Sequence, residues 1–253
     1  MDLKKVIDKS LGNLPVKLII QNIPIIGSSL YTVLSETTNK WREKRFEVFL
    51  QKLDEKIRMI EISDQKIVSE MQKKINTEDF YDFFVNAAQK STMTHKKEKI
   101  SRFANLLKNY LINDLSSDNY IIEVFFNITD DLSEIEVNKL SELQIKPLEV
   151  HYSFDNKPID IEKMKLDISE KRLSTDFRSI PKEYEYDKFY MYSYNRLEKL
   201  DLVQIEIIEN AGGYVTVGWS TDNQSTHTQL HYMRKDEITI SDFGKNYIDW
   251  ILN

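Results

Sequence analysis

Apolar residues recur at helical spacing over most of the first 145 positions of the chain. Residues three and four apart share one face of an α-helix, so this spacing predicts amphipathic helices. The predicted helices cover residues 1–13, 37–62, 77–87, 95–115 and 130–143, with a short apolar segment at 119–127. We therefore expect a helical N-terminal domain over residues 1–128.

Toward the C-terminus the pattern changes to short alternating runs. Residues 202–208 and 214–219 alternate like two strands around a glycine-containing turn, and residues 236–240 predict a third short strand. Helices are predicted at 185–200 and after Ser241, which would cap the last helix. These are the parts of a winged-helix unit. Its first helix would be Leu132–Leu143, and Tyr186–Leu200 would take the recognition-helix position.

Residues 145–182 lack clear periodicity and hold three of the five prolines, Pro147, Pro158 and Pro181. Because proline removes a backbone donor, we expect an irregular insertion there. The predicted fold is thus mainly α with a smaller α+β part. It consists of the helical domain over 1–128 and a winged-helix-like domain over 129–253 that contains the insertion.

The most apolar stretch is Leu18–Ser35, which contains no charged residue and carries Ile19, Ile20, Ile23, Ile25, Ile26 and Leu30. As one helix it would reach about 27 Å, close to the minimum for a membrane span. Gln21, Asn22, Pro24 and Gly27 interrupt it, which favours two short helical pieces. Three interpretations stay open: a buried hairpin, an interfacial or pore-forming segment that contacts a membrane or partner, and a constitutive transmembrane helix.

Composition excludes several classes of chemistry. The chain has no cysteine, which rules out disulfides and thiolate chemistry, and only six glycines, which makes glycine-rich phosphate loops scarce. It has no Gly-x-Ser-x-Gly, Walker-type or His-Glu-x-x-His motif. The net charge is −6, of which −5 falls in residues 151–253. We therefore predict no catalytic residues and no cofactor, and we expect nucleic acid to be a poor partner.

An aromatic cluster is the strongest candidate for a contact site. It consists of Tyr186, Phe189, Tyr190, Tyr192 and Tyr194. On a helix these residues cannot all share one face, so one set is expected in the core and the other exposed. Exposed aromatic residues are typical of the energetic centres of protein interfaces, and we expect this set to bind a protein partner.

Two weaker candidates carry charge or nitrogen ligands. The only local basic patch consists of Lys96, Lys97, Lys99 and Arg102. It is either a solvated helix face or a contact for an anionic surface, such as lipid headgroups or phosphates. His227 and His231 are weak candidates for a metal site, because the sequence places no third ligand. The alternative is a pair of surface histidines in a wing.

Several stretches together resemble the abortive-infection alpha family of bacterial phage-defence proteins. They are NIPIIGSSLYTVL at 22–34, HKKEKISRFANLLKNYL at 95–111 with its Arg102-Phe103-Ala104 step, and the closing segments LEKLDLVQIE and EITISDFGKNYIDWI. The resemblance implies a role in stopping phage, and it carries no catalytic residues. The region Leu148–Lys182 shows no pattern of that family.

The leading hypothesis is a non-enzymatic abortive-infection protein that recognises a protein partner, such as a phage component, through its C-terminal domain. In a more specific form, Leu18–Ser35 disrupts an anionic membrane, and the protein lies at its inner face; otherwise we expect a cytoplasmic protein. A homo-oligomer stays open. The alternatives are a winged-helix DNA-binding regulator and a nuclease or hydrolase without a recognised motif.

Overall fold

The computed structural model describes residues 40–61, 70–71, 73–113, 119–153, 157–161, 163–164, 185–186, 190–209, 213–221, 224–232 and 234–252. The chain divides into an N-terminal unit, Met1–Leu132 with Asp249–Asn253, and a C-terminal unit, Ser133–Ile248. The last residues of the chain thus join the N-terminal unit. The predicted apolar segment Leu18–Ser35 lies outside the described residues.

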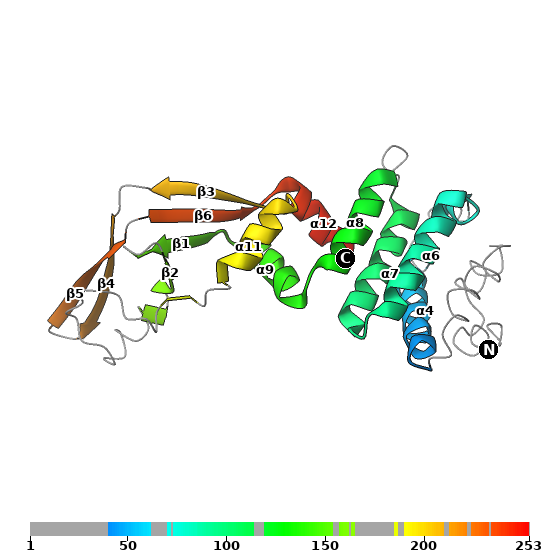
Figure 1. Ribbon diagram of the computed structural model, residues 1–253, viewed down its shortest axis with the longest axis horizontal. Helices are drawn as coiled ribbons and strands as arrows, with labels where there is room; N and C mark the ends of the chain where they lie inside the picture. The colour runs from blue at the N-terminus through cyan, green and yellow to red at the C-terminus, as the bar shows by residue number, and fades with distance from the viewer. Residues whose placement is uncertain are drawn as a thin grey trace. The chain divides into compact units, whose positions relative to one another are not determined.

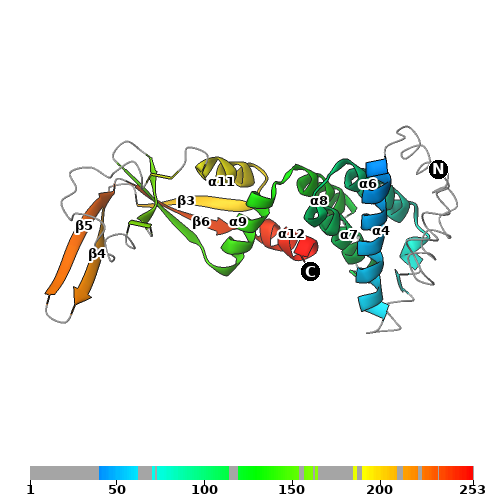
Figure 2. The same ribbon diagram turned by 90° about the horizontal axis from the view of Figure 1, so that it is seen from below.

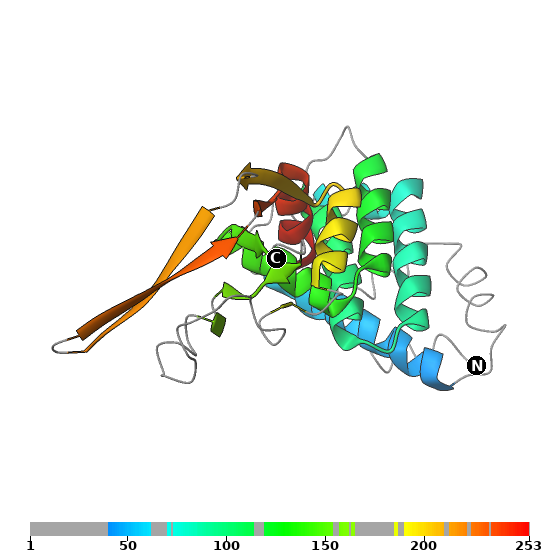
Figure 3. The ribbon, with the colours of Figure 1, turned by 60° about the vertical axis from the view of Figure 1, so that its left-hand side comes forward.

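The described N-terminal unit is helical, as the periodicity predicts (Figure 1). Its helices are α4 (Lys40–Glu61), α6 (Glu78–Met93), α7 (Lys97–Ile112) and α8 (Asn119–Asp131). Helix α7 packs against α4, α6 and α8, and Figure 3 shows α6, α7 and α8 side by side. Aromatic rings fill the spaces between the helices: the ring centres of Phe49 and Phe84 lie 6.0 Å apart, and those of Phe103 and Phe126 lie 6.1 Å apart. Thr77 caps α6 by accepting from the Phe80 N–H.

Two buried asparagines of α7 hold the end of the last helix, α12 (Asp242–Leu252), within the same unit. Asn105 Nδ2 donates to the carbonyl of Ile251 at 2.7 Å, and Asn109 Nδ2 donates to the carbonyl of Trp250 at 2.8 Å. The last carbonyls of a helix have no partner inside the helix, so buried ones need such donors. The two asparagines therefore explain how polar side chains are accommodated on the buried side of α7.

The C-terminal unit contains a four-stranded antiparallel sheet in the order β2-β1-β6-β3. Its elements in chain order are α9 (Glu134–Ile145), β1 (Leu148–Tyr152), β2 (Pro158–Ile159), α11 (Tyr190–Lys199), β3 (Val203–Glu209), β4 (Gly213–Thr221), β5 (Gln224–Tyr232), β6 (Arg234–Ile240) and the first part of α12. The predicted pairing of residues 202–208 with 214–219 is wrong, because β3 pairs with β6 and β4 pairs with β5 in a separate two-stranded ribbon. The molecule is thus mainly helical, with the sheet toward its C-terminus.

The prediction of an irregular insertion over 145–182 is wrong for its first part. Strand β1 lies inside the sheet, between β2 and β6, and β2 forms an edge. Pro158 begins β2, where an edge strand tolerates the missing backbone donor. Strand β5 was not predicted either, because its sequence QSTHTQLHY is too polar to show an alternating apolar pattern.

We call the face of this sheet that carries Ile205, Ile207 and Asp236 the inner face; the opposite face is partly covered too, because His151 and Ile159 on it are buried. Helix α9 contacts β6, and α11 contacts β3; Figure 2 shows α11 on one side of β3 and β6. The buried Val150, Val203 and Ile238 lie on the inner face. Successive strand residues point to opposite faces, so Glu149, Glu206 and Glu237 lie on the other, outer face.

Only glycine fits at position 244, because the backbone of Leu202 lies very close to the start of α12 there. Its N–H donates to Ser241 Oγ at 2.9 Å, which confirms Ser241 as the cap of this helix. A Cβ at position 244 would lie 2.1 Å from the backbone carbonyl oxygen of Leu202. That oxygen accepts from the Ser241 N–H, so it cannot move without breaking this hydrogen bond.

We expect Gly244→Ala to lower the free energy of unfolding by about 2 kcal/mol, because overpacking against backbone costs more than the roughly 1 kcal/mol that alanine gains in a helix. Chemical denaturation followed by circular dichroism measures the change. The matched control is Asn246→Ala at an exposed position of the same helix, which should be neutral or slightly stabilising. Equal stability of the two variants would show that the Leu202 carbonyl is not fixed.

Candidate functional site

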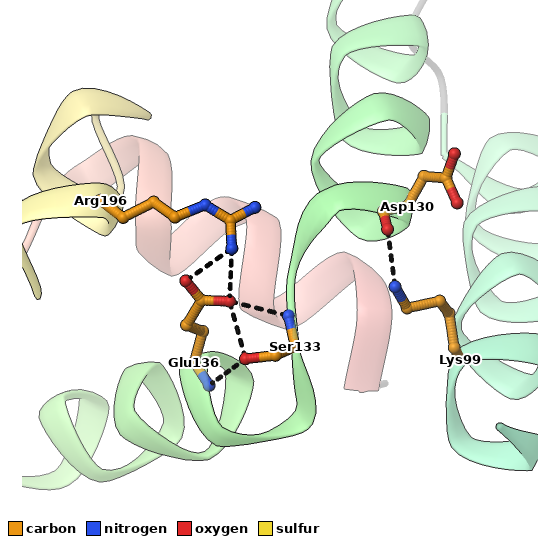
Figure 4. Close-up of polar contacts among 5 residues, drawn as sticks. All are labelled: Lys99, Asp130, Ser133, Glu136 and Arg196. Atoms are coloured by element: carbon orange, nitrogen blue, oxygen red, sulfur yellow. Dashed lines mark hydrogen bonds and ion pairs between the residues drawn. The ribbon is translucent and has the colours of Figure 1, made fainter. Parts of the chain in front are cut away.

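Helix α11 occupies the position of the predicted contact helix, and an ion pair with a buried carboxylate links it to α9. Glu136 is 3% exposed, and Arg196 Nη1 donates to its two carboxylate oxygens at 2.9 and 3.0 Å (Figure 4). The same carboxylate accepts from the N–H and the hydroxyl of Ser133, at 2.8 and 2.7 Å, in a capping box at the start of α9. The charge of Arg196, whose side chain is 35% exposed, is therefore paired within the unit.

A stack of tyrosines continues this attachment. The rings of Tyr186 and Tyr190 lie 3.6 Å apart and nearly parallel, and Tyr194 meets Tyr190 edge-on at 5.6 Å. Lys139 of α9 places its ammonium 4.6 and 4.0 Å from the rings of Tyr190 and Tyr194, and it donates to the Tyr190 carbonyl at 3.0 Å. Burial raises the pKa of Tyr194 to about 12 and lowers the pKa of Lys139. Tyr190 and Tyr194 are therefore packing residues, and burial keeps both as neutral phenols.

The exposed residues of α11 are Tyr192, Asn195, Glu198 and Lys199. Tyr192 is 64% exposed, whereas Tyr194 is 3% exposed. Tyr194 is therefore too buried to contact a partner, and the prediction that it does so is wrong, whereas Tyr192 is exposed. Phe189 lies outside the described residues. The exposed side of α11 carries one cation, Lys199, beside one anion, Glu198, so it has no net positive charge.

A cavity of about 410 Å³ lies beside α11, on the inner face of the sheet. Its lining residues are Tyr152, Pro158, Met191, Asn195, Glu198, Ile205, Ile207, Arg234 and Asp236. Asp236 is fully buried, and Arg234 Nε donates to it at 2.6 Å while Nη2 donates to its other oxygen. The guanidinium also lies 4.8 Å from the centre of the Tyr152 ring. Burial, with the charge of Asp236, raises the pKa of Tyr152 to about 12.

Because Arg234 and Asp236 neutralise each other, Glu198 supplies the remaining charge of this cavity. A second cavity of about 510 Å³ lies near the end of α9 and β1, where Tyr186, Tyr194, His151 and Glu142 are among its lining residues. Neither arrangement brings together a nucleophile, a base and an orienting group. What the site offers is an exposed tyrosine and an acidic, partly apolar cavity next to the edge strand β3.

The predicted basic patch does not form one surface. Arg102 is 6% exposed and lies in the core of the N-terminal unit, so the prediction that it contacts an anionic surface is wrong. Lys99 Nζ donates to the carbonyl of Asp130 at the end of α8, at 2.6 Å (Figure 4). Lys96 is the N-terminal cap residue of α7, and Lys97 is exposed. A helix turns by about 100° per residue, so a basic run of this length reaches the buried side.

His227 and His231 both lie in β5, opposite Gly218 and Tyr214 of β4. Their side chains lie outside the described residues. Four residues along a strand separate the Cα atoms by about 13 Å, which is unfavourable for binding the same ion. In the part of the chain that the structure describes, no three His, Asp or Glu side chains are grouped to hold a metal ion. Among the described helices, none is both long and apolar enough to cross a bilayer.

Sequence analysis missed Glu136, Lys139, Arg234 and Asp236. The spacing Ser133-x-x-Glu136 before an apolar run is a readable capping-box signal. The pair Arg234 and Asp236 sits two apart on one strand, which places both on the same face. The partner of Glu136 lies 60 residues away along the chain, and no local pattern indicates it.

We expect a double-mutant cycle of Arg196→Met and Glu136→Gln to give a coupling energy of about 1–3 kcal/mol, because Arg196→Met leaves the buried Glu136 carboxylate without its charge partner. Urea unfolding of the four proteins measures it. The control cycle uses the exposed pair Lys52 and Glu55, for which about 0.5 kcal/mol or less is expected. Equal couplings in the two cycles would contradict the assignment of α11 to a fixed position.

The chain matches no known protein family, no curated protein and no solved structure. The resemblance to the abortive-infection alpha family therefore stays a prediction, and the function has to be argued from the residues described above.

Proposed function

We propose that this protein is a non-enzymatic anti-phage protein that acts by protein recognition, and that its C-terminal unit is a winged-helix-like module carrying the recognition surface. The strand order β1-β6-β3, with α9 before β1 and α11 before β3, supports the winged-helix interpretation. In this interpretation α11 takes the recognition position and the β4–β5 ribbon is the wing. The defence role rests on the family resemblance given above.

Protein recognition is supported by one observation: α11 and the wing offer few cations that are not paired or beside an acid. Phosphate contacts dominate the affinity of DNA-binding proteins and need free Lys and Arg side chains. On α11, Arg196 is held by Glu136, and Lys199 lies beside Glu198. The wing adds none, because Asp222 is the sole charged residue in positions 210–233. An exposed tyrosine without surrounding cations suits a protein surface better than a phosphate backbone.

A winged-helix DNA-binding regulator is the second candidate, and the strand order is the observation that favours it. It requires that Lys199 and residues beyond those described supply the phosphate contacts. The membrane-disrupting form of the first proposal rests on Leu18–Ser35 alone. A nuclease or hydrolase finds no supporting arrangement among the residues that the structure describes.

We expect Tyr192→Ala to reduce protection of a phage-challenged host by at least about tenfold, since removal of a central interface aromatic commonly costs 2 kcal/mol or more. Efficiency of plating measures protection, and the melting temperature of the purified variant checks its fold. The matched control is Tyr120→Ala, which removes a tyrosine that is 75% exposed on α8. Loss of protection in both variants, or in neither, would contradict the assignment of the partner surface to α11.

Duplex DNA separates the two candidates directly. We expect the purified protein to give no salt-dependent mobility shift with random-sequence duplex at low micromolar concentration and low ionic strength, because its α11 and wing offer too few cations. A host nucleoid protein of known affinity serves as the positive control. A shift that is lost on raising the salt concentration and abolished by Lys199→Glu would favour the DNA-binding regulator instead.

A further inference from the structure

Strand β3 forms an open edge of the C-terminal sheet. The order β2-β1-β6-β3 leaves its far side without a strand partner in the described part of the chain (Figure 1). In an edge strand, alternate N–H and C=O groups point away from the sheet and can accept a further strand. Ile207 and Ile208 at the end of this strand are 54% and 50% exposed, so apolar surface accompanies the free backbone groups.

The two faces of this edge differ in chemistry. On the inner face, Ile205 and Ile207 line the 410 Å³ cavity together with Met191 of α11. On the outer face, Glu206 lies directly opposite Glu237 of β6, and Glu237 lies directly opposite Glu149 of β1. Like charges placed opposite each other on neighbouring strands are destabilising. Three glutamates thus form a row across three strands, which ends at the open edge with Glu206.

Part of this row is neutralised within the protein. Lys235 forms an ion pair with Glu149 at 2.8 Å, and this hydrogen bond lowers the pKa of Glu149. Among the described residues, neither Glu206 nor Glu237 forms an ion pair. The negative charge that remains is therefore concentrated at the β3 end of the row.

We propose that the β3 edge binds an extended segment of a partner protein in which aliphatic residues alternate with lysine or arginine. Strand addition would place every second side chain of that segment on the inner face, beside Ile205, Ile207 and the cavity. The intervening side chains would lie on the outer face, beside Glu206. This inference deepens the proposed function by naming the chemistry of the partner, and it rests on that function.

Charge complementarity selects this occupant over a second copy of the chain. Pairing two β3 edges would bring one Glu206 toward the other, and residues 151–253 of each copy carry a net charge of −5. A basic partner strand gains from the same acids that repel a copy. The cavity also has room for an aliphatic side chain, and Glu198 at its rim is a further acid.

The experiment titrates the full chain with three blocked peptides of equal length: alternating valine and lysine, alternating valine and glutamate, and alternating valine and threonine. We expect the valine–lysine peptide to bind at least about tenfold more tightly than the other two. Hydrogen exchange should show new protection of amides in residues 203–208. Equal affinities, or protection confined to other segments, would overturn the inference.

Two pairs of variants separate strand addition from general attraction to an acidic protein. Glu206→Lys should abolish the preference for the valine–lysine peptide, whereas Glu123→Lys, the same charge change on α8, should leave it intact. Ile207→Lys should weaken binding at least about tenfold, whereas Ile145→Lys, at a position that is 88% exposed, should not. Equal effects within either pair would contradict the site. A dimer of the free chain whose stability changes with Glu206→Lys would also contradict it, because a second copy would then occupy the β3 edge.

These results are distinguishable from a failure of the proposed function. If the peptides do not discriminate while Tyr192→Ala still removes protection, the protein recognises its partner elsewhere and only the inference about β3 fails. If duplex DNA binds instead, both the proposed function and this inference fail together.

Discussion

Two buried carboxylates each hold an arginine in the C-terminal unit, and the chemistry of its surface follows from this. Glu136 at 3% exposure binds Arg196, and the fully buried Asp236 binds Arg234. A buried carboxylate costs several kcal/mol of lost hydration unless a charged donor with good geometry compensates it. The two arginines meet that requirement, so neither is free for a ligand.

This arrangement orders the unit more than it stabilises it. Buried ion pairs often contribute little net stability compared with apolar groups of the same volume, but they demand one geometry. The pair Glu136–Arg196 joins α9 to α11 over a separation of 60 residues, and Lys139 adds its contacts with Tyr190 and Tyr194. The exposed Tyr192 is thereby carried on a helix whose position is fixed.

The helices were predictable from sequence because burial of one helix face requires apolar residues every three or four positions, and this spacing is visible within each segment. The runs around Phe46, Phe80 and Phe103 show it, and each belongs to a described helix. Strand β1 was not predictable, because LEVHY is too short for alternation to stand out and its partner β6 lies far along the chain. Arg102 was misplaced for a related reason: charge pattern indicates a surface, whereas tertiary packing decides which basic residue is buried.

The candidate site was predictable where it depends on one element and unpredictable where it depends on several. Helical spacing predicted that the aromatic cluster on α11 divides into a buried and an exposed set, but it did not show that Tyr194 is buried. The acidic row across β1, β6 and β3 needs the strand order and the register, and neither is written in any single segment. The same holds for the cavity, whose walls come from α11 and from strands β1, β2, β3 and β6.

The position of Glu206 illustrates how one residue can serve two requirements. An open edge strand with exposed isoleucines is a liability, because it can pair with any other edge, including that of a second copy. A charged residue in the middle of the edge opposes such pairing, and a glutamate opposes it most strongly when the opposing edge is also acidic. Lysine at this position would protect the edge equally well against a copy. Glutamate at position 206 lies opposite Glu237 and also determines which segments can pair with the edge. A basic segment reduces the repulsion between Glu206 and Glu237, whereas an acidic segment increases it.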